Sequence, residues 1–115
     1  MLRGDICLID LEPVRGSEAD ERRPAVVVSN DRANAAASRS GRGVIAVVPV
    51  TSNVARVLPF QTLLATAATG LRVDSKAQAE QVRSVAVERV GPVVARVPPR
   101  VMAELDEALR LHLQL

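Results

Sequence analysis

The sequence has few of the residues from which metal and acid–base sites are usually built. Its 115 residues include one cysteine, Cys7, and one histidine, His112. A single cysteine cannot form a disulfide within the chain, and these two side chains do not make up the usual structural zinc sets. Mechanisms that use two histidines as acid and base are excluded as well. We therefore expect no metal and no cofactor, and we expect His112 to be a packing or interface residue.

Aromatic residues and long apolar runs are also scarce. The chain has no tryptophan or tyrosine and one phenylalanine, so it lacks the stacking platforms on which single-strand-binding modules hold bases. The longest apolar run, Val44 to Val50, is far shorter than the roughly 20 residues that span a bilayer, and the first residues have no signal-peptide character. These patterns predict a cytoplasmic protein without a membrane anchor.

The positive charge is concentrated in the middle of the chain. Residues 32–100 carry ten basic and three acidic groups, a net charge of +7, although the whole chain has a net charge of only +2. All basic residues except Lys76 are arginines, whose planar guanidinium groups bind phosphate in a forked geometry. This asymmetry suits a polyanionic ligand, but a solvated basic surface has the same composition.

Short apolar segments separated by turn residues predict a mainly β fold. Strands are expected at residues 4–11, 23–30, 43–51, 58–64 and 92–97, and residues 31–38 are expected to form a short helical turn capped by Asn30 or Asp31. Residues 74–90 mix helix-favouring and strand-favouring residues, and we interpret them as mainly strand. From Pro98 onward the helical spacing of apolar residues predicts a terminal helix. Together they indicate a small, strongly curved β-barrel or half-barrel in a single domain, residues 1–115.

Two short segments carry the candidate chemistry. Arg22 and Arg23 precede a valine-rich strand, and Thr51 and Ser52 follow the most apolar strand. An arginine beside a phosphodiester stabilises the charge that grows as the bond breaks, and RNA supplies its own nucleophile, the 2′-hydroxyl. The same residues also fit a purely structural interpretation, in which the arginines extend along the surface and the hydroxyls satisfy a turn.

Clustered carboxylates between residues 10 and 21 suit a magnesium site less well than a solvated acidic loop. Glu18 is the carboxylate that we retain, because it lies in the loop that leads into the two arginines. A carboxylate there is able to accept a proton if the fold brings it within hydrogen-bond reach of the reacting group.

Four segments in order resemble the MazF/PemK-type toxins. They are "RGDICLIDLEPVRGSEADERRPAVVVSND" from Arg3 to Asp31, "VPVTSN" from Val48 to Asn53, "AEQVRSV" from Ala79 to Val85, and the terminal helix. The resemblance implies a small SH3-like β-barrel of the MazF/PemK/CcdB type with a C-terminal helix. It also implies the toxin half of a toxin–antitoxin pair, active as a homodimer and inhibited by a MazE-like antitoxin.

Members of that family are metal-independent, ribosome-independent endoribonucleases that cut single-stranded RNA at short motifs and leave 2′,3′-cyclic phosphate and 5′-hydroxyl ends. Carried over to this sequence, the resemblance places the catalytic arginine at Arg23, the threonine at Thr51 and the loop glutamate at Glu18. It suggests RNA-binding roles for Ser52, Asn53, Gln81, Arg83 and Arg22, with a buried structural role as an alternative for Gln81. Cys7 departs from the family, which usually has an aromatic residue there.

Two other functions stay open at this stage. The same barrel occurs in CcdB-type toxins, which bind gyrase and cut nothing, and a nucleic-acid-binding adaptor on this barrel would also fit. The arginine–proline strand combined with the threonine–serine pair favours the nuclease, because a binding module does not need both.

Overall fold

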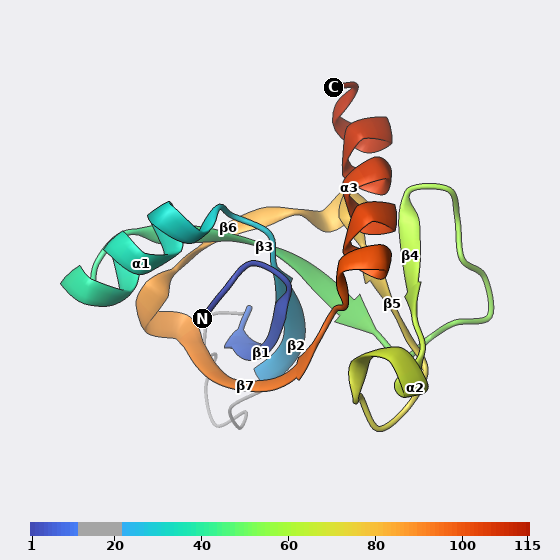
Figure 1. Cartoon of the computed structure of the whole chain (residues 1–115), viewed down its shortest axis with the longest axis horizontal. Coiled ribbons are helices and arrows are strands. Elements are labelled where there is room, and N and C mark those ends of the chain that lie inside the picture. Colours follow the sequence, from blue (N-terminus) through green and yellow to red (C-terminus); the bar gives the residue numbers. More distant parts are fainter. Residues whose placement is uncertain (12–21) are drawn as a thin grey trace, which may run out of the picture.

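In the computed structural model, which describes residues 1–11 and 22–115, seven strands form one curved antiparallel sheet (Figure 1). The strand order is β4-β5-β3-β2-β1-β7, and β6 also pairs with β3. The mainly β fold with a terminal helix is thus confirmed. No helix within the described residues is long and apolar enough to span a membrane. The strands are β1 (Asp5–Asp10), β2 (Arg22–Val27), β3 (Val44–Thr51), β4 (Gln61–Leu64), β5 (Ser75–Gln78), β6 (Arg83–Ala86) and β7 (Val90–Arg96).

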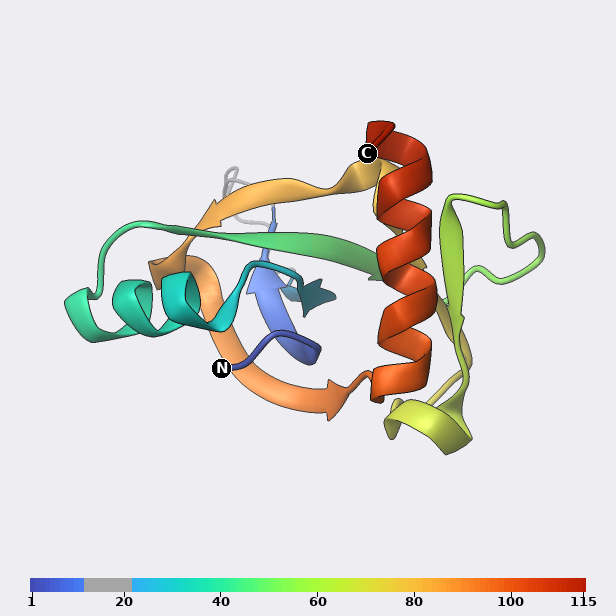
Figure 2. The same cartoon turned by 45° about the horizontal axis from the view of Figure 1, so that its top comes forward.

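Strand β3 is the centre of the sheet. It pairs with β6 near its start, with β2 in its middle and with β5 at its end. Val47 and Val48 are both fully buried but belong to different cores, because neighbouring side chains of a strand point to opposite faces. The long strand that crosses the molecule in Figure 2 therefore has a core on each side.

The two cores lie inside and outside the curved part of the sheet. The inner core is bounded by β1, β2, β3, β6 and β7 and is covered by Ala37 of helix α1 (Asp31–Ser40). The outer core lies between the sheet and helix α3 (Pro99–Leu113), which packs against β4 (Figure 2). Leu105 of α3 is fully buried there, and each such large side chain contributes roughly 1.5–3 kcal/mol.

Both expected helices are present, and local capping explains the limits of α1. The Asn30 side chain accepts a hydrogen bond from the backbone N–H of Ala33 at 2.8 Å and thereby caps α1. Gly41 ends α1 with a φ of 67°, a conformation that glycine adopts without strain. A further short helix, α2 (Thr66–Thr69), was not predicted, and β4 begins only at Gln61.

The interpretation of residues 74–90 as mainly strand is confirmed, but two 3₁₀ turns interrupt the segment. The segment contains β5, a 3₁₀ turn η1 (Ala79–Gln81), β6 and a second 3₁₀ turn η2 (Val87–Arg89). β5 pairs Ala77 with Val50, and β6 pairs Arg83 with Val47. Between these pairs β3 advances by three residues and its partner by six, so three extra residues bulge out as η1. Bulged residues of this kind re-aim side chains, and Gln81 is one of them.

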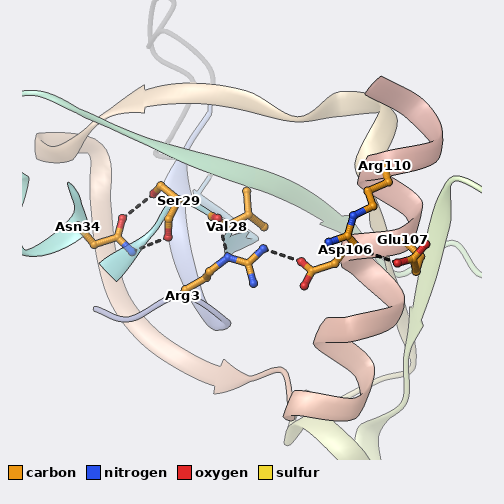
Figure 3. A network of polar contacts seen from close by, with 7 residues as sticks. All are labelled: Arg3, Val28, Ser29, Asn34, Asp106, Glu107 and Arg110. Atoms are coloured by element: carbon orange, nitrogen blue, oxygen red, sulfur yellow. Dashed lines mark hydrogen bonds and ion pairs between the residues drawn. The ribbon is translucent and has the colours of Figure 1, made fainter. Parts of the chain in front are cut away.

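A polar network around Arg3 ties helix α3 to the rest of the sheet (Figure 3). Nε of Arg3 donates to the carbonyl of Val28 at 2.8 Å, and its Nη2 forms an ion pair with Asp106 of α3 at 2.5 Å. The backbone N–H of Arg3 donates to Asp31 of α1 at 2.6 Å. Arg3 therefore joins three segments that are distant in the sequence.

A second part of the network satisfies a buried amide. Asn34 is fully buried, and its Nδ2 donates to the carbonyl of Ser29 at 2.9 Å, while the Ser29 hydroxyl donates to Asn34 Oδ1 (Figure 3). Because a buried amide without partners is costly, these bonds fix the turn between β2 and α1.

Replacing Arg3 with alanine is expected to lower the free energy of unfolding by about 1–2 kcal/mol, because both the carbonyl of Val28 and Asp106 lose their charged donor. Chemical denaturation followed by circular dichroism measures this change. Arg100→Ala is the control, since Arg100 is exposed and makes no side-chain contact of this kind within the described residues. Equal stabilities of the two variants would contradict the role of Arg3.

Candidate functional site

Strand β2 begins with two exposed arginines and ends with three buried residues. Arg22 and Arg23 are exposed, Pro24 is half-buried, and the remaining residues of the strand are buried. Antiparallel pairing sets Arg22 opposite Asp10 and Arg23 opposite Ile9 in β1. The buried valines therefore hold the backbone of the arginines in place, because β2 is paired on both sides.

The register of β2 and β3 brings Arg23 to the level of Thr51. The two strands pair Val27 with Val47 and Ala25 with Pro49. Extending this register by two residues sets Arg23 and Thr51 at the same level and, by the alternation of the pleat, on the same face. That face lines the inner core farther along the strands, so both side chains lie at one end of the curved sheet.

Thr51 also takes part in the turn that follows β3. Its Oγ1 accepts a hydrogen bond from the backbone N–H of Asn53 at 3.2 Å, and Oδ1 of Asn53 accepts one from Ala55 at 3.3 Å. The hydroxyl of Thr51 therefore does stabilise a turn, which is the structural role that the sequence left open for this segment. The Thr51 hydroxyl acts as an acceptor in this bond, and its own hydrogen can still be donated to a ligand oxygen.

Arg83 and Gln81 extend the same end of the molecule. Arg83 is exposed, and its Nη1 donates to the carbonyl of Leu11 at 2.9 Å, where β1 ends. Because Arg83 pairs with Val47, its side chain lies on the face of Arg23 and Thr51. Gln81 is exposed on the η1 bulge, which excludes the buried role considered for it.

Arg22 and Ser52 lie on the opposite face of the sheet. A side-chain carbon at Gly91 of β7 would lie 3.0 Å from Arg22 Nη1 and 2.7 Å from the carbonyl of Leu8, so the guanidinium of Arg22 reaches across β1. Ser52 lines a cleft of about 640 Å³ on this face, together with Pro24, Leu71, Arg72, Val73 and Val94. The sequence does not indicate this cleft, because its walls come from distant segments.

Three further residues stood out in the sequence, namely Glu18, His112 and Cys7. Glu18 lies outside the described residues. His112 lies on α3 with its ring centroid 6.4 Å from that of Phe60, away from Arg23. Cys7 is fully buried opposite Ala25 in the inner core, and burial raises the pKa of its thiol, so it is a core residue.

Lys76 is a further residue near Thr51, and its place in the sequence does not indicate a role. It is the cross-strand partner of Thr51, it is buried, and its Nζ donates to the carbonyl of Arg56 at 2.7 Å. Two features of the sequence could have drawn attention to it: Lys76 is the chain's one lysine, and it lies inside a segment interpreted as strand.

The chain matches, over residues 2–113, the family described as PemK-like, MazF-like toxin of type II toxin–antitoxin system. Endoribonuclease MazF9 of Mycobacterium tuberculosis is 64% identical over all of this chain and 98% of its own length. Endoribonuclease EndoA of Bacillus subtilis is 31% identical over 98% of this chain and 94% of its own length. A solved MazE–MazF structure (Form-II) from Deinococcus radiodurans has a TM-score of 0.77 at 27% identity, covering 100% of this chain and 96% of that one.

Proposed function

Because the chain belongs to the PemK-like, MazF-like toxin family of type II toxin–antitoxin systems, we propose that it cuts single-stranded RNA at a short sequence motif without a metal ion or the ribosome. Curated relatives that align with nearly the whole chain are named endoribonucleases, and this chain is an endoribonuclease of the same family. The family favours this function over the gyrase-binding alternative, and we propose that the RNA is cut in the cytoplasm.

The observation that supports the proposal is the register of β2 with β3, which pairs Ala25 with Pro49 and, extended by two residues, sets Arg23 level with Thr51 on one face. In the proposed reaction the 2′-oxygen of RNA attacks the adjacent phosphorus while the bond to the 5′-oxygen breaks. The 2′-hydroxyl proton passes to a base and the leaving 5′-oxygen gains a proton, which gives a 2′,3′-cyclic phosphate and a 5′-hydroxyl end. Arg23 stabilises the charge on the non-bridging oxygens, and Thr51 donates its hydroxyl to one of them.

Other residues have supporting roles in the proposal. Glu18 is the proposed base, or the group that positions Arg23. Arg83 and Gln81 extend the surface beside Arg23 and contact the RNA on either side of the cut, and Asn53 lies close to Thr51. Because the chain has one aromatic residue, bases are discriminated by hydrogen bonds and arginine planes in place of stacking. Arg22 and Ser52, on the other face, bind the chain of phosphates as it leaves the site.

Purified protein should cut a long unstructured RNA in excess EDTA at one recurring motif, leaving 5′-hydroxyl ends. Arg23→Ala should lower the cleavage rate by about 100-fold or more, because a preorganised charge at the transition state is lost. Arg100→Ala, an exposed arginine on α3, is the matched control and should cut at the normal rate. Mapping of new 5′ ends measures both. Absence of cleavage by folded, antitoxin-free protein would contradict the nuclease and favour the gyrase-binding or adaptor function.

We further propose that the protein is a homodimer and that a MazE-like antitoxin inhibits it. Similar solved structures from Deinococcus radiodurans are MazE–MazF complexes. The cleft of about 640 Å³ supports this, because its apolar wall of Pro24, Leu71 and Val94 is adjoined by Arg72. An antitoxin tail that contains both apolar and acidic side chains would match such a surface. Since Ser52 also lines the cleft, a bound tail would obstruct the RNA that passes there.

A peptide of acidic and apolar residues from the cognate antitoxin should compete with RNA for the protein. Val73→Asp should weaken peptide binding about tenfold or more, because it sets a charge in the apolar wall and repels the acidic tail. Val44→Asp is the control, since Val44 is exposed and does not line the cleft. Fluorescence anisotropy measures both ligands. Simultaneous binding of peptide and RNA without loss of affinity would contradict the arrangement.

A further inference from the structure

Lys76 is a buried cation beside the candidate site, with no described carboxylate to balance it. The residue is 8% exposed, and among the described residues its ammonium donates to a neutral acceptor, the carbonyl of Arg56. The ion pairs of the described chain involve arginines, and none includes Lys76. Burying an ammonium group without an anion costs free energy, so its presence there calls for a compensating ligand.

The position of Lys76 relative to Thr51 indicates where that ligand would lie. The two residues are direct partners in the pairing of β3 with β5, so their side chains share a face. Arg23 lies on this face too, by the register of β2 with β3. The three residues therefore form a row across three neighbouring strands, Arg23 on β2, Thr51 on β3 and Lys76 on β5.

The loop of residues 52–60 contacts one end of this row, at the buried Lys76. Lys76 holds the loop through Arg56, and Gln61 holds it through a second bond, in which the backbone N–H of Leu58 donates to Gln61 Oε1 at 3.0 Å. Of these two buried side chains only Lys76 carries a charge. Comparing substitutions of Lys76 and Gln61 therefore distinguishes the effect of the charge from the effect of holding the loop.

We propose that Lys76 is a second cationic group of the RNA site, which strengthens binding of the phosphate at Thr51 by its charge. This rests on the proposed function, because it assumes an RNA phosphate at Thr51. An ammonium group has three donors, and one is used by Arg56, so two are left to face the bound anion. The low-dielectric surroundings of the loop make the attraction stronger than that of an exposed lysine. Lys76 acts alongside Thr51 and is a positioning residue for the phosphate.

The salt dependence of binding tests the charge directly. The probe is a short, labelled single-stranded DNA copy of the mapped RNA motif, which lacks the 2′-hydroxyl and is not cut. On single strands the logarithm of the affinity falls with the logarithm of the salt concentration by about 0.7 per neutralised phosphate. Lys76→Met should reduce the magnitude of this slope by about 0.7, and Lys76→Arg should restore it. Gln61→Met, which removes the other anchor of the loop without changing charge, should keep the wild-type slope.

A measurement on the wild-type chain covers the case in which Lys76→Met does not fold. With ¹⁵N-lysine labelling, Lys76 supplies the one side-chain ammonium signal of the chain, and saturating DNA copy should shift it. An unmoved signal, or a Lys76→Met slope equal to that of the wild type in a protein that cuts RNA, overturns the inference alone. A wild-type protein that neither cuts RNA nor binds the DNA copy overturns the proposed function and this inference with it.

Discussion

The pairing of β3 with β2 is the constraint on which the rest of the molecule depends. It buries Val26 and Val48 in the outer core and Val27 and Val47 in the inner core, so one ladder fixes both cores. A shift of this register by one residue would direct these side chains to the opposite core and disrupt the packing of both cores. The same register sets Arg23 level with Thr51. The stability of the sheet and the geometry of the candidate site therefore have a common cause.

The partners of β3 change along its length, and this gives the site its shape. At its start β3 pairs with β6 and helps to enclose the inner core, and at its end it pairs with β5 and faces the loop of residues 52–60. The three extra residues of η1 let one segment of chain follow β3 through both environments. Gln81 is therefore exposed at the surface, whereas Lys76 is buried and donates to the loop at Arg56. Two polar residues only a few positions apart thus have opposite exposures.

Local patterns were sufficient to predict the order of the main elements but not their interruptions. Strand β3 was identifiable because it is apolar on both faces, and α1 because Asn30 is a good helix cap. The break at η1 was not identifiable, because it results from pairing with β3 and the valines around it favour strand. Arg22 and Arg23 are adjacent in the sequence, but the pleat directs them to opposite faces, which the sequence did not indicate. Burial of Lys76 depends on the fold of a loop distant in sequence, and no local pattern indicates it.

The central claim is that Arg23 and Thr51 act on the same phosphate, and a double-mutant cycle on RNA cleavage tests it most directly. Single-turnover rates are measured for wild type, Arg23→Ala, Thr51→Ala and the double variant, each checked for folding. Residues that act as a unit have strongly non-additive effects, so the double variant should cut nearly as fast as the slower single variant. If the two losses multiply in the double variant, the residues act independently, and the account of the site is contradicted.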